Sequence, residues 1–193
     1  TTENEEIYTL ERYLELKSEG FQFEGQSYLF WEFMRILTDI RKYNPDVKFL
    51  LENVEIGNKW ERVLSEAIGV FGVHINSALV SAQSRKRIYW ENIRVKEVGL
   101  FGELHSDIPQ PKDEGILLKD ILEEKVDEKY YLSDKGTIGM FSHKERHLNN
   151  GNGFGVQFID ENSEKSNTLL SRYYKDCKDN AICVAQRGRN PDN

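Results

Sequence analysis

The fold of this chain is restricted most by a short apolar run, Val47-Lys48-Phe49-Leu50-Leu51, which follows the turn signal Asn44-Pro45. An apolar segment of this length, bounded by a turn, is typical of a strand buried on both faces in a parallel sheet. The run stops at the polar pair Glu52-Asn53. We therefore expect a central strand over residues 47–51 with a carboxylate at its end.

Helical patterns flank this strand on both sides. The pattern before it predicts a helix with Ser27 as N-cap and Asn44-Pro45 as stop, whose apolar stripe consists of Leu29, Phe33, Ile36, Leu37 and Ile40. The pattern after it predicts a helix over residues 60–68, ended by Gly69. A weaker pattern over residues 7–18 indicates a surface helix, and residues 70–80 and 87–95 are expected to be strands.

This alternation of helices and strands predicts an α/β fold with an open sheet. In such sheets ligands bind beyond the carboxyl ends of the parallel strands, and Glu52 is expected at one of these ends. The composition changes near residue 105, where residues 107–112 resemble a linker. We expect one domain over residues 1–105. The second, over residues 106–193, should be smaller, loop-rich and mostly β, with a helix near residues 117–124.

Charge and composition exclude few functions. The net charge is -7, but residues 1–24 alone carry -5, so the remainder is close to neutral and can meet a nucleic acid. The apolar runs are too short to cross a bilayer. Cys177 and Cys183 show neither metal-knuckle nor disulfide-scaffold spacing, which favours a reducing, cytoplasmic setting. Both termini read as boundaries within a longer protein.

Two polar segments could carry chemistry. At the end of a buried strand, Glu52 should have limited access to water, which raises a carboxyl pKa and suits proton exchange. The alternative is a polar strand end that caps the following turn. If residues 83–89 are extended, Gln83, Arg85, Arg87 and Tyr89 share one face. Two guanidinium groups there require an anion, either a carboxylate such as Glu52 or a DNA phosphate. The alternative is a solvated edge strand whose charge blocks aggregation.

Three blocks, in this order and spacing, resemble the DNA (cytosine-5) methyltransferase family of bacterial or phage type. They are Leu29-Phe30 with Arg35-Ile36, the strand Phe49-Leu50-Leu51-Glu52-Asn53-Val54, and a Gln-x-Arg-x-Arg block formed by Gln83, Arg85 and Arg87. The resemblance covers about residues 20–95. Residues 118–132 and 167–176 resemble the beginning of the family's target recognition domain.

The resemblance implies that residues 1–105 are the C-terminal portion of a Rossmann-like methyltransferase domain. Such enzymes, found in restriction–modification systems, transfer a methyl group from S-adenosylmethionine to C5 of a cytosine flipped out of double-stranded DNA. A cysteine attacks C6, and a glutamate hydrogen-bonds the N3 side and the N4 amino group of the ring. The match assigns the glutamate role to Glu52, and its orientation to Arg87 and secondarily Arg85. Asn53 and Gln83 would support the base pocket, and Leu29 would line the adenine side of the cofactor site.

The chain also departs from the family pattern. The family's nucleophile lies in a Pro-Cys-Gln block upstream of the first helix, whereas Cys177 and Cys183 lie far downstream and follow Asp and Ile. A Phe-x-Gly-x-Gly cofactor loop is missing, because the glycines at 151, 153 and 155 follow no strand and are expected to form a loop. The closing family blocks are absent too. We therefore expect the 193-residue chain to be inactive in isolation. We separately expect it to be a monomer.

Two other functions are compatible with parts of the sequence. The first is a DNA-binding recognition module or decoy without catalysis, in which Arg187 and Arg189 contact DNA; the alternative for these two is an exposed basic loop. The second is a metal site at His143 and His147. It lacks the usual motif order and a third ligand, so no metal is expected.

Overall fold

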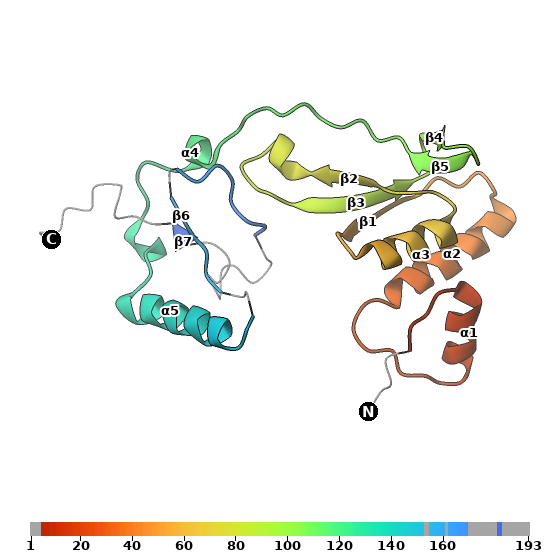
Figure 1. The fold of residues 1–193 in the computed structure, drawn as a ribbon, viewed down its shortest axis with the longest axis horizontal. Coiled ribbons are helices and arrows are strands. Elements are labelled where there is room, and N and C mark those ends of the chain that lie inside the picture. Colours follow the sequence, from red (N-terminus) through yellow and green to blue (C-terminus); the bar gives the residue numbers. More distant parts are fainter. Residues whose placement is uncertain (1–4, 153–154, 161, 170–180, 183–193) are drawn as a thin grey trace, which may run out of the picture. The chain divides into compact units, whose positions relative to one another are not determined.

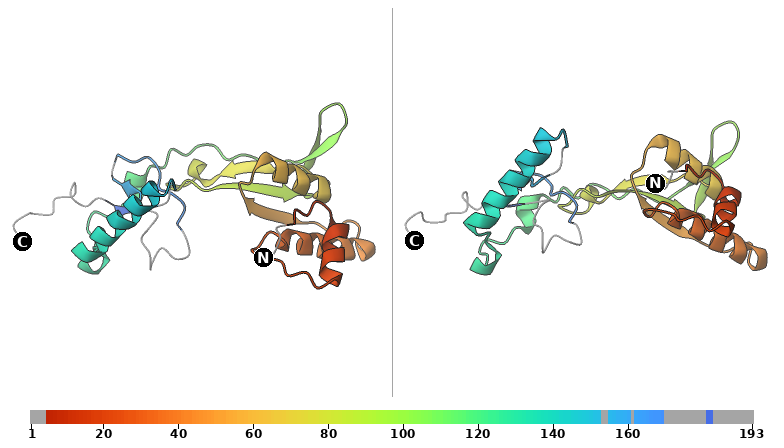
Figure 2. Two further views of the ribbon diagram at one scale, coloured as in Figure 1. Left: turned by 60° about the horizontal axis from the view of Figure 1, so that its bottom comes forward. Right: turned by 90° about the horizontal axis from the view of Figure 1, so that it is seen from below.

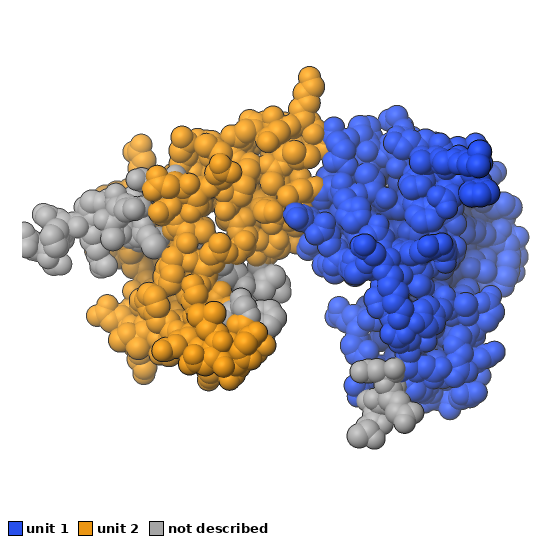
Figure 3. Space-filling model, viewed as in Figure 1, with its two compact units in different colours: residues 1–75, 86–110 blue, residues 76–85, 111–193 orange. Residues whose placement is uncertain are grey.

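The computed structural model describes residues 5–152, 155–160, 162–169 and 181–182. Its helices and strands are shown in Figures 1 and 2, and its division into two compact units in Figure 3. The first unit comprises residues 1–75 and 86–110, and the second comprises residues 76–85 and 111–193. Segment 76–85 therefore belongs to the second unit although both of its neighbours in sequence belong to the first.

The first unit combines three helices with two antiparallel ladders. The helices are α1 (Leu10–Ser18), α2 (Leu29–Tyr43) and α3 (Asn58–Ile68), and the strands are β1 (Leu50–Val54), β2 (Val73–Asn76), β3 (Lys86–Glu91), β4 (Val95–Val98) and β5 (Glu103–Ser106). One sheet has the order β1-β3-β2, in which β1 and β3 are antiparallel, and β4 and β5 form a separate antiparallel pair. The predicted α/β class is confirmed at this level.

The core of this unit lies between the helices and one face of β3. Ile88 and Trp90 are completely buried and share that face, because side chains two residues apart on a strand point the same way. Trp31, Met34 and Leu37 of α2 and Leu64 and Ile68 of α3 belong to the same apolar cluster. The two helices therefore cover one face of the sheet.

Two contacts show how tightly this core is packed. The indole Nε1–H of Trp90 donates to Oγ of the buried Ser65 at 2.9 Å. Gly72 lies so close to β3 that a Cβ at this position would be 2.6 Å from Cγ2 of Ile88. Only glycine fits there without displacing a neighbour.

The predicted helices are present, with two corrections. Gly69 ends α3 in the left-handed conformation, at φ 84°, as predicted. Ser27 is not the N-cap of α2, because that position is occupied by Tyr28, whose side chain makes no capping hydrogen bond. The predicted apolar stripe is correct only in part, because Leu37 is buried and Phe33 packs against the core, whereas Leu29, Ile36 and Ile40 are exposed. The helix carries two apolar stripes, and the sheet buries the one that contains Trp31.

Strand β1 differs from its prediction in position, direction and burial. The side chain of Asn92 hydrogen-bonds to the backbone of residues 47–49, where the strand was predicted to begin. Phe49 N–H donates to Asn92 Oδ1 at 2.9 Å, and Asn92 Nδ2 donates to Val47 O at 2.8 Å. The ladder therefore begins later and continues through Glu52 to Val54. Its residues alternate between exposed and half-buried, so a parallel strand buried on both faces is the wrong description.

The second unit contains more helix than expected. Its described elements are a 3-10 turn at Ser77–Leu79, α4 (Leu118–Ile121), a 3-10 turn at Glu128–Tyr130, α5 (Asp134–Asn149), and the parallel pair β6 (Phe158–Ile159) and β7 (Ala181–Ile182). Helix α5 has 16 residues, whereas β6 and β7 have two each, so the described part of the second unit is not mostly β as the sequence predicted. Helix α5 buries no side chain, which explains its weak apolar periodicity.

Candidate functional site

An ion pair between Glu52 and Arg87 forms the center of the candidate site. In the β1–β3 ladder Glu52 faces Tyr89 and Val54 faces Arg87, so Glu52 and Arg87 are diagonal neighbours on the same face of the sheet. Arg87 Nε lies 2.7 Å from Glu52 Oε1. The structure thus brings together the predicted carboxylate and the guanidinium group of Arg87.

The two partners differ in their access to solvent. The Arg87 side chain is 15% exposed, and its Nη1 also donates to Lys86 O at 2.7 Å. Two acceptors in different directions therefore hold the planar guanidinium group in place. The Glu52 side chain is 43% exposed, so the expectation of limited access to water is wrong in this structure. A mostly buried cation thus orients a carboxylate that a ligand can still reach.

The exposure of Glu52 follows from its position within β1. It lies in the middle of the strand, on the face opposite to the one that α2 and α3 cover, between Leu50 and Val54, which are 57% and 50% exposed. Asn53, not Glu52, makes the local contact expected of a turn cap, because its Oδ1 accepts from the Val54 N–H at 2.8 Å.

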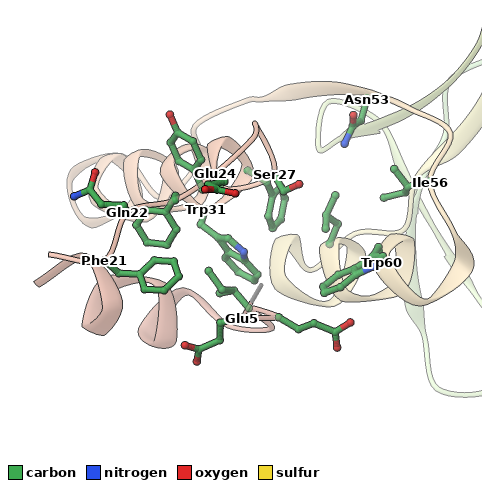
Figure 4. A pocket seen from close by; sticks show the side chains of 15 residues that line it. Glu5, Phe21, Gln22, Glu24, Ser27, Trp31, Asn53, Ile56 and Trp60 are labelled. Atoms are coloured by element: carbon green, nitrogen blue, oxygen red, sulfur yellow. The ribbon is translucent and has the colours of Figure 1, made fainter. Parts of the chain in front are cut away.

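Asn53 points to the other face of the sheet, as strand alternation requires. There it lines a cavity of about 400 Å³ together with Ile56 of the following loop and Trp60 of α3 (Figure 4). The other labelled walls are aromatic, acidic or polar, and they come from the segments before α1 and α2 and from Trp31 in the first turn of α2. The side chains of the consecutive residues Glu52 and Asn53 therefore lie on opposite faces of β1.

Gln83 and Arg85 belong to the second unit, and hydrogen bonds of their backbone groups join both of them to it. Arg85 N–H donates to Asn76 Oδ1 at 3.0 Å, and Arg85 O accepts from Ser77 N–H at 3.1 Å. Gln83 forms a parallel bridge with Ser166. Strand β3 begins only at Lys86, so Arg87 and Tyr89 are on the strand, whereas Gln83 and Arg85 precede it. Both lie in the turn over residues 76–85, which contains the 3-10 turn Ser77–Leu79.

The remaining candidates are Leu29, the arginines and cysteines near the end of the chain, and the two histidines of α5. Leu29 is the first residue of α2 and is half exposed. Arg187, Arg189 and both cysteines lie outside the described residues. His143 and His147 are adjacent on α5, with their Nε2 atoms 3.2 Å apart, yet within the described residues no group of three potential ligands could hold a metal ion.

Sequence reasoning did not find the ion cluster that joins α1 to α2. Glu32 accepts hydrogen bonds from Lys17, from the Tyr13 hydroxyl at 2.5 Å and from Arg35 Nε at 2.9 Å. These bonds, led by the one from Lys17, lower the pKa of Glu32 to about 2. The spacing of Glu32 and Arg35, three residues apart on a helix, was the available signal. This cluster fixes the helix that carries the Leu29-Phe30 block.

Comparison with known proteins identifies the family. Residues 17–191 match the C-5 cytosine-specific DNA methylase family. The chain is 33% identical over 187 residues to the Type II methyltransferase M1.ScrFI of Lactococcus lactis subsp. cremoris, covering 91% of this chain and 46% of that protein. For M.DsaV of Dactylococcopsis salina the identity is also 33% over 187 residues, covering 91% and 50%.

A third relative, the Type II methyltransferase M.HpaII of Haemophilus parainfluenzae, is 34% identical over 158 residues, which cover 74% of this chain and 41% of that protein. The chain thus spans about half the length of the relatives it matches. Among the described residues no helix has both the length and the apolar composition needed to cross a bilayer. Because the family match extends over most of its length, this chain belongs to the C-5 cytosine-specific DNA methylase family.

Proposed function

We propose that this chain is part of a DNA (cytosine-5) methyltransferase and that Glu52 contacts a cytosine flipped out of double-stranded DNA. The observation that carries the proposal is the Glu52–Arg87 ion pair, with a distance of 2.7 Å, in a chain of this family. The pair supplies what the reaction needs: a carboxylate that a ligand can reach, held in one orientation by an arginine.

The chemistry assigned to Glu52 is electrostatic. Its carboxyl group would hydrogen-bond the N4 amino group and the N3 side of the cytosine, which favours positive charge on the ring. C6 then becomes more electrophilic and accepts a nucleophile, after which C5 can take the methyl group. Arg87 would act on the ring through Glu52, because its guanidinium group prevents the carboxylate from rotating away.

S-adenosylmethionine would supply the methyl group. Leu29, half exposed at the start of α2, offers one apolar surface on which an adenine ring can pack. One apolar side chain cannot hold the charged methionine portion of this cofactor, and Leu29 does not line the cavity beside Asn53. Leu29 by itself therefore does not compose a cofactor site.

We further propose that the sheet β1-β3-β2 is a portion of a larger Rossmann-like sheet. Within the described residues β1 is the edge strand, and its Leu50 and Val54 are exposed, as are Ile36 and Ile40 of α2. Apolar side chains of this kind on an open edge are suited to burial by a further layer. Residues 106–193 would begin the target recognition domain. The DNA contacts of Arg187 and Arg189, the base-pocket roles of Asn53 and Gln83, and the secondary role of Arg85 stay predictions.

The test measures transfer of a labelled methyl group from S-adenosylmethionine to cytosine in double-stranded DNA by the natural protein that contains this sequence. Glu52→Gln should lower kcat by about 10²–10⁴-fold, the usual contribution of a positioned acid or base. Glu55→Gln is the matched control, because it removes a nearby exposed carboxylate and should leave the rate nearly unchanged. The 193-residue chain alone should transfer no label.

Three outcomes would contradict the proposal in different ways. A wild-type protein that transfers no methyl group to any DNA refutes the function. A Glu52→Gln variant as active as wild type refutes the role of Glu52 while the function stands. Transfer by the 193-residue chain alone contradicts the expectation that a Pro-Cys block must supply the nucleophile.

A further inference from the structure

A segment far downstream in the sequence is bonded to the turn that carries Gln83 and Arg85. Ser84 N–H donates to Ser166 O at 2.9 Å, and Ser166 N–H donates to Ala82 O at 2.8 Å, as part of the parallel bridge between Gln83 and Ser166. Thr168 Oγ1 adds a bond to Ser84 O at 3.0 Å. Residues 164–168, which we call the clamp segment, thus lie along residues 82–84 within the second unit.

Lys165 of the clamp segment has an unusual set of partners. Its ammonium group donates to three backbone carbonyl oxygens, Ala78 O at 2.6 Å, Ser81 O at 2.9 Å and Ile116 O at 2.5 Å. These bonds use all three donors of the ammonium group, and bonds from a charged donor are stronger than neutral ones. One cation therefore ties together three backbone positions that are not adjacent in sequence.

The turn that Lys165 holds also contains hydrogen bonds between its own residues. Ser77 Oγ donates to Gln83 O at 2.8 Å, and Ser81 Oγ donates to Ser77 O at 2.9 Å. Asn76 and Ser77 bond the backbone of Arg85. A displacement of the backbone at residue 78 or 81 must therefore move residues 83–85, and the chain continues directly from Arg85 into strand β3.

We propose that Lys165 is a positioning residue for the Gln-x-Arg-x-Arg block. By binding the carbonyls of Ala78 and Ser81 it places the backbone of residues 83–85, and with it Gln83 and Arg85 immediately before β3. The consequence for methyl transfer rests on the proposed function; the structural consequence does not. It also means that the block is correctly placed only when the downstream clamp segment is folded against it.

The structural test uses the 193-residue chain and amide hydrogen exchange. In Lys165→Met three carbonyls lose their donor, so the amides of Ser84 and Ser166 should exchange at least about 10-fold faster, while the amides of the β1–β3 ladder keep their rates. Lys165→Arg, which retains a charged donor, should restore much of the protection. Lys129→Met is the matched control, because Lys129 is exposed and pairs with Asp127 at 3.0 Å.

Two results of this experiment would overturn the proposal. The first is protection of Ser84 and Ser166 in Lys165→Met equal to that in wild type. The second is loss of protection throughout the second unit in both Lys165 variants, because the lysine would then hold the whole unit together instead of placing one turn.

The functional test uses the natural protein and separates kcat from KM. Lys165→Met should lower kcat by about 10–100-fold, the effect of a small misplacement of reacting groups, with the KM for S-adenosylmethionine unchanged. Lys165→Arg should recover part of kcat, and Lys129→Met should match wild type. Normal kcat in Lys165→Met, when Glu52→Gln is inactive, overturns the positioning role and leaves the proposed function intact. A wild-type protein without activity refutes the proposed function, and hydrogen exchange then decides whether Lys165 holds the turn.

Discussion

Replacing Ser65 with alanine removes the hydrogen bond that anchors β3 to α3. Trp90 on β3 is fully buried, its Nε1–H donates to Ser65 Oγ at 2.9 Å, and Ser65 is itself buried. The substitution deletes a single oxygen atom, so little packing volume is lost. The indole N–H remains in the core without its acceptor. Strand β3 also carries Arg87, so this anchor supports the candidate site indirectly.

The size of the effect follows from this burial. A hydrogen-bond donor left unpaired in a protein interior costs about 1–3 kcal/mol, because it loses the water that would otherwise solvate it. Trp90 has no exposed surface through which water could replace the hydroxyl. We therefore expect Ser65→Ala to lower the free energy of unfolding of the first unit by about 2 kcal/mol.

Tryptophan fluorescence reports on this unit alone. All three tryptophans of the chain, at positions 31, 60 and 90, lie in the first unit. In a urea titration the slope for a small domain is about 1–3 kcal/mol per molar, so a loss of about 2 kcal/mol lowers the midpoint by about 0.7–2 M. Ser18→Ala, which removes an exposed hydroxyl that donates to Glu15 O, should leave the midpoint nearly unchanged.

A double-mutant cycle shows whether the loss comes from this bond. Trp90→Phe removes the donor, and the two remaining tryptophans still report unfolding. In that background Ser65→Ala should cost much less than in wild type, since no N–H is left unpaired. Equal costs in both backgrounds, or a wild-type midpoint in the single variant, would show that the hydroxyl does not anchor the indole.

Two further predictions concern the same unit and use the same titration. Gly72→Ala places a methyl group 2.6 Å from Ile88 Cγ2 and should destabilise the unit by about 1–3 kcal/mol, the usual cost of overpacking; an unchanged midpoint would refute the close approach. Burial opposes charge on His74, but its contacts with Glu61 at 2.9 Å and Glu55 at 3.4 Å outweigh that and raise the pKa of His74 above 6.5. Because the pKa of His74 is higher in the folded chain than in the unfolded chain, protonation of His74 stabilises the fold at a pH below the unfolded-state pKa. This stabilisation is lost as the pH rises through the folded-state pKa. The unit should therefore be more stable at pH 6 than at pH 8.5, by about the 0.2–1 kcal/mol of an exposed pair, and His74→Asn should abolish the difference.

Several local features could be predicted because they depend on nearby residues. Gly69 ends α3, since a left-handed backbone after an apolar helix requires glycine. Helix α2 stops before Asn44-Pro45, because proline disfavours a helical residue before it. The positions of β1 and α2 were less accurate. Asn92 binds the backbone at Val47 and Phe49, and a bond across more than forty residues leaves no periodic signal.

Some features of the candidate site could likewise be predicted from the sequence, and others could not. The residue types and their order, a glutamate after an apolar run and then alternating arginines, were enough to suggest the family. They were also enough to name Glu52 as one of two possible anions for the arginines, the other being a DNA phosphate, and the family resemblance then assigned it to Arg87. They could not show that β1 and β3 are antiparallel, that Glu52 is on the exposed face, or that Arg85 belongs to a separate turn.

The C-terminal ends of α2 and α3, the family blocks and the candidates for a carboxylate–arginine pair could be read from the amino-acid sequence, because backbone preferences and charge are properties of short segments. The strand register, the choice between the two apolar stripes of α2 and the binding of Lys165 to three carbonyls came from the folded chain alone. These features depend on which distant segments meet. Which segments come into contact is determined by the space that side chains must fill and by the backbone groups that still need hydrogen-bond partners. Neither is a property of any single segment.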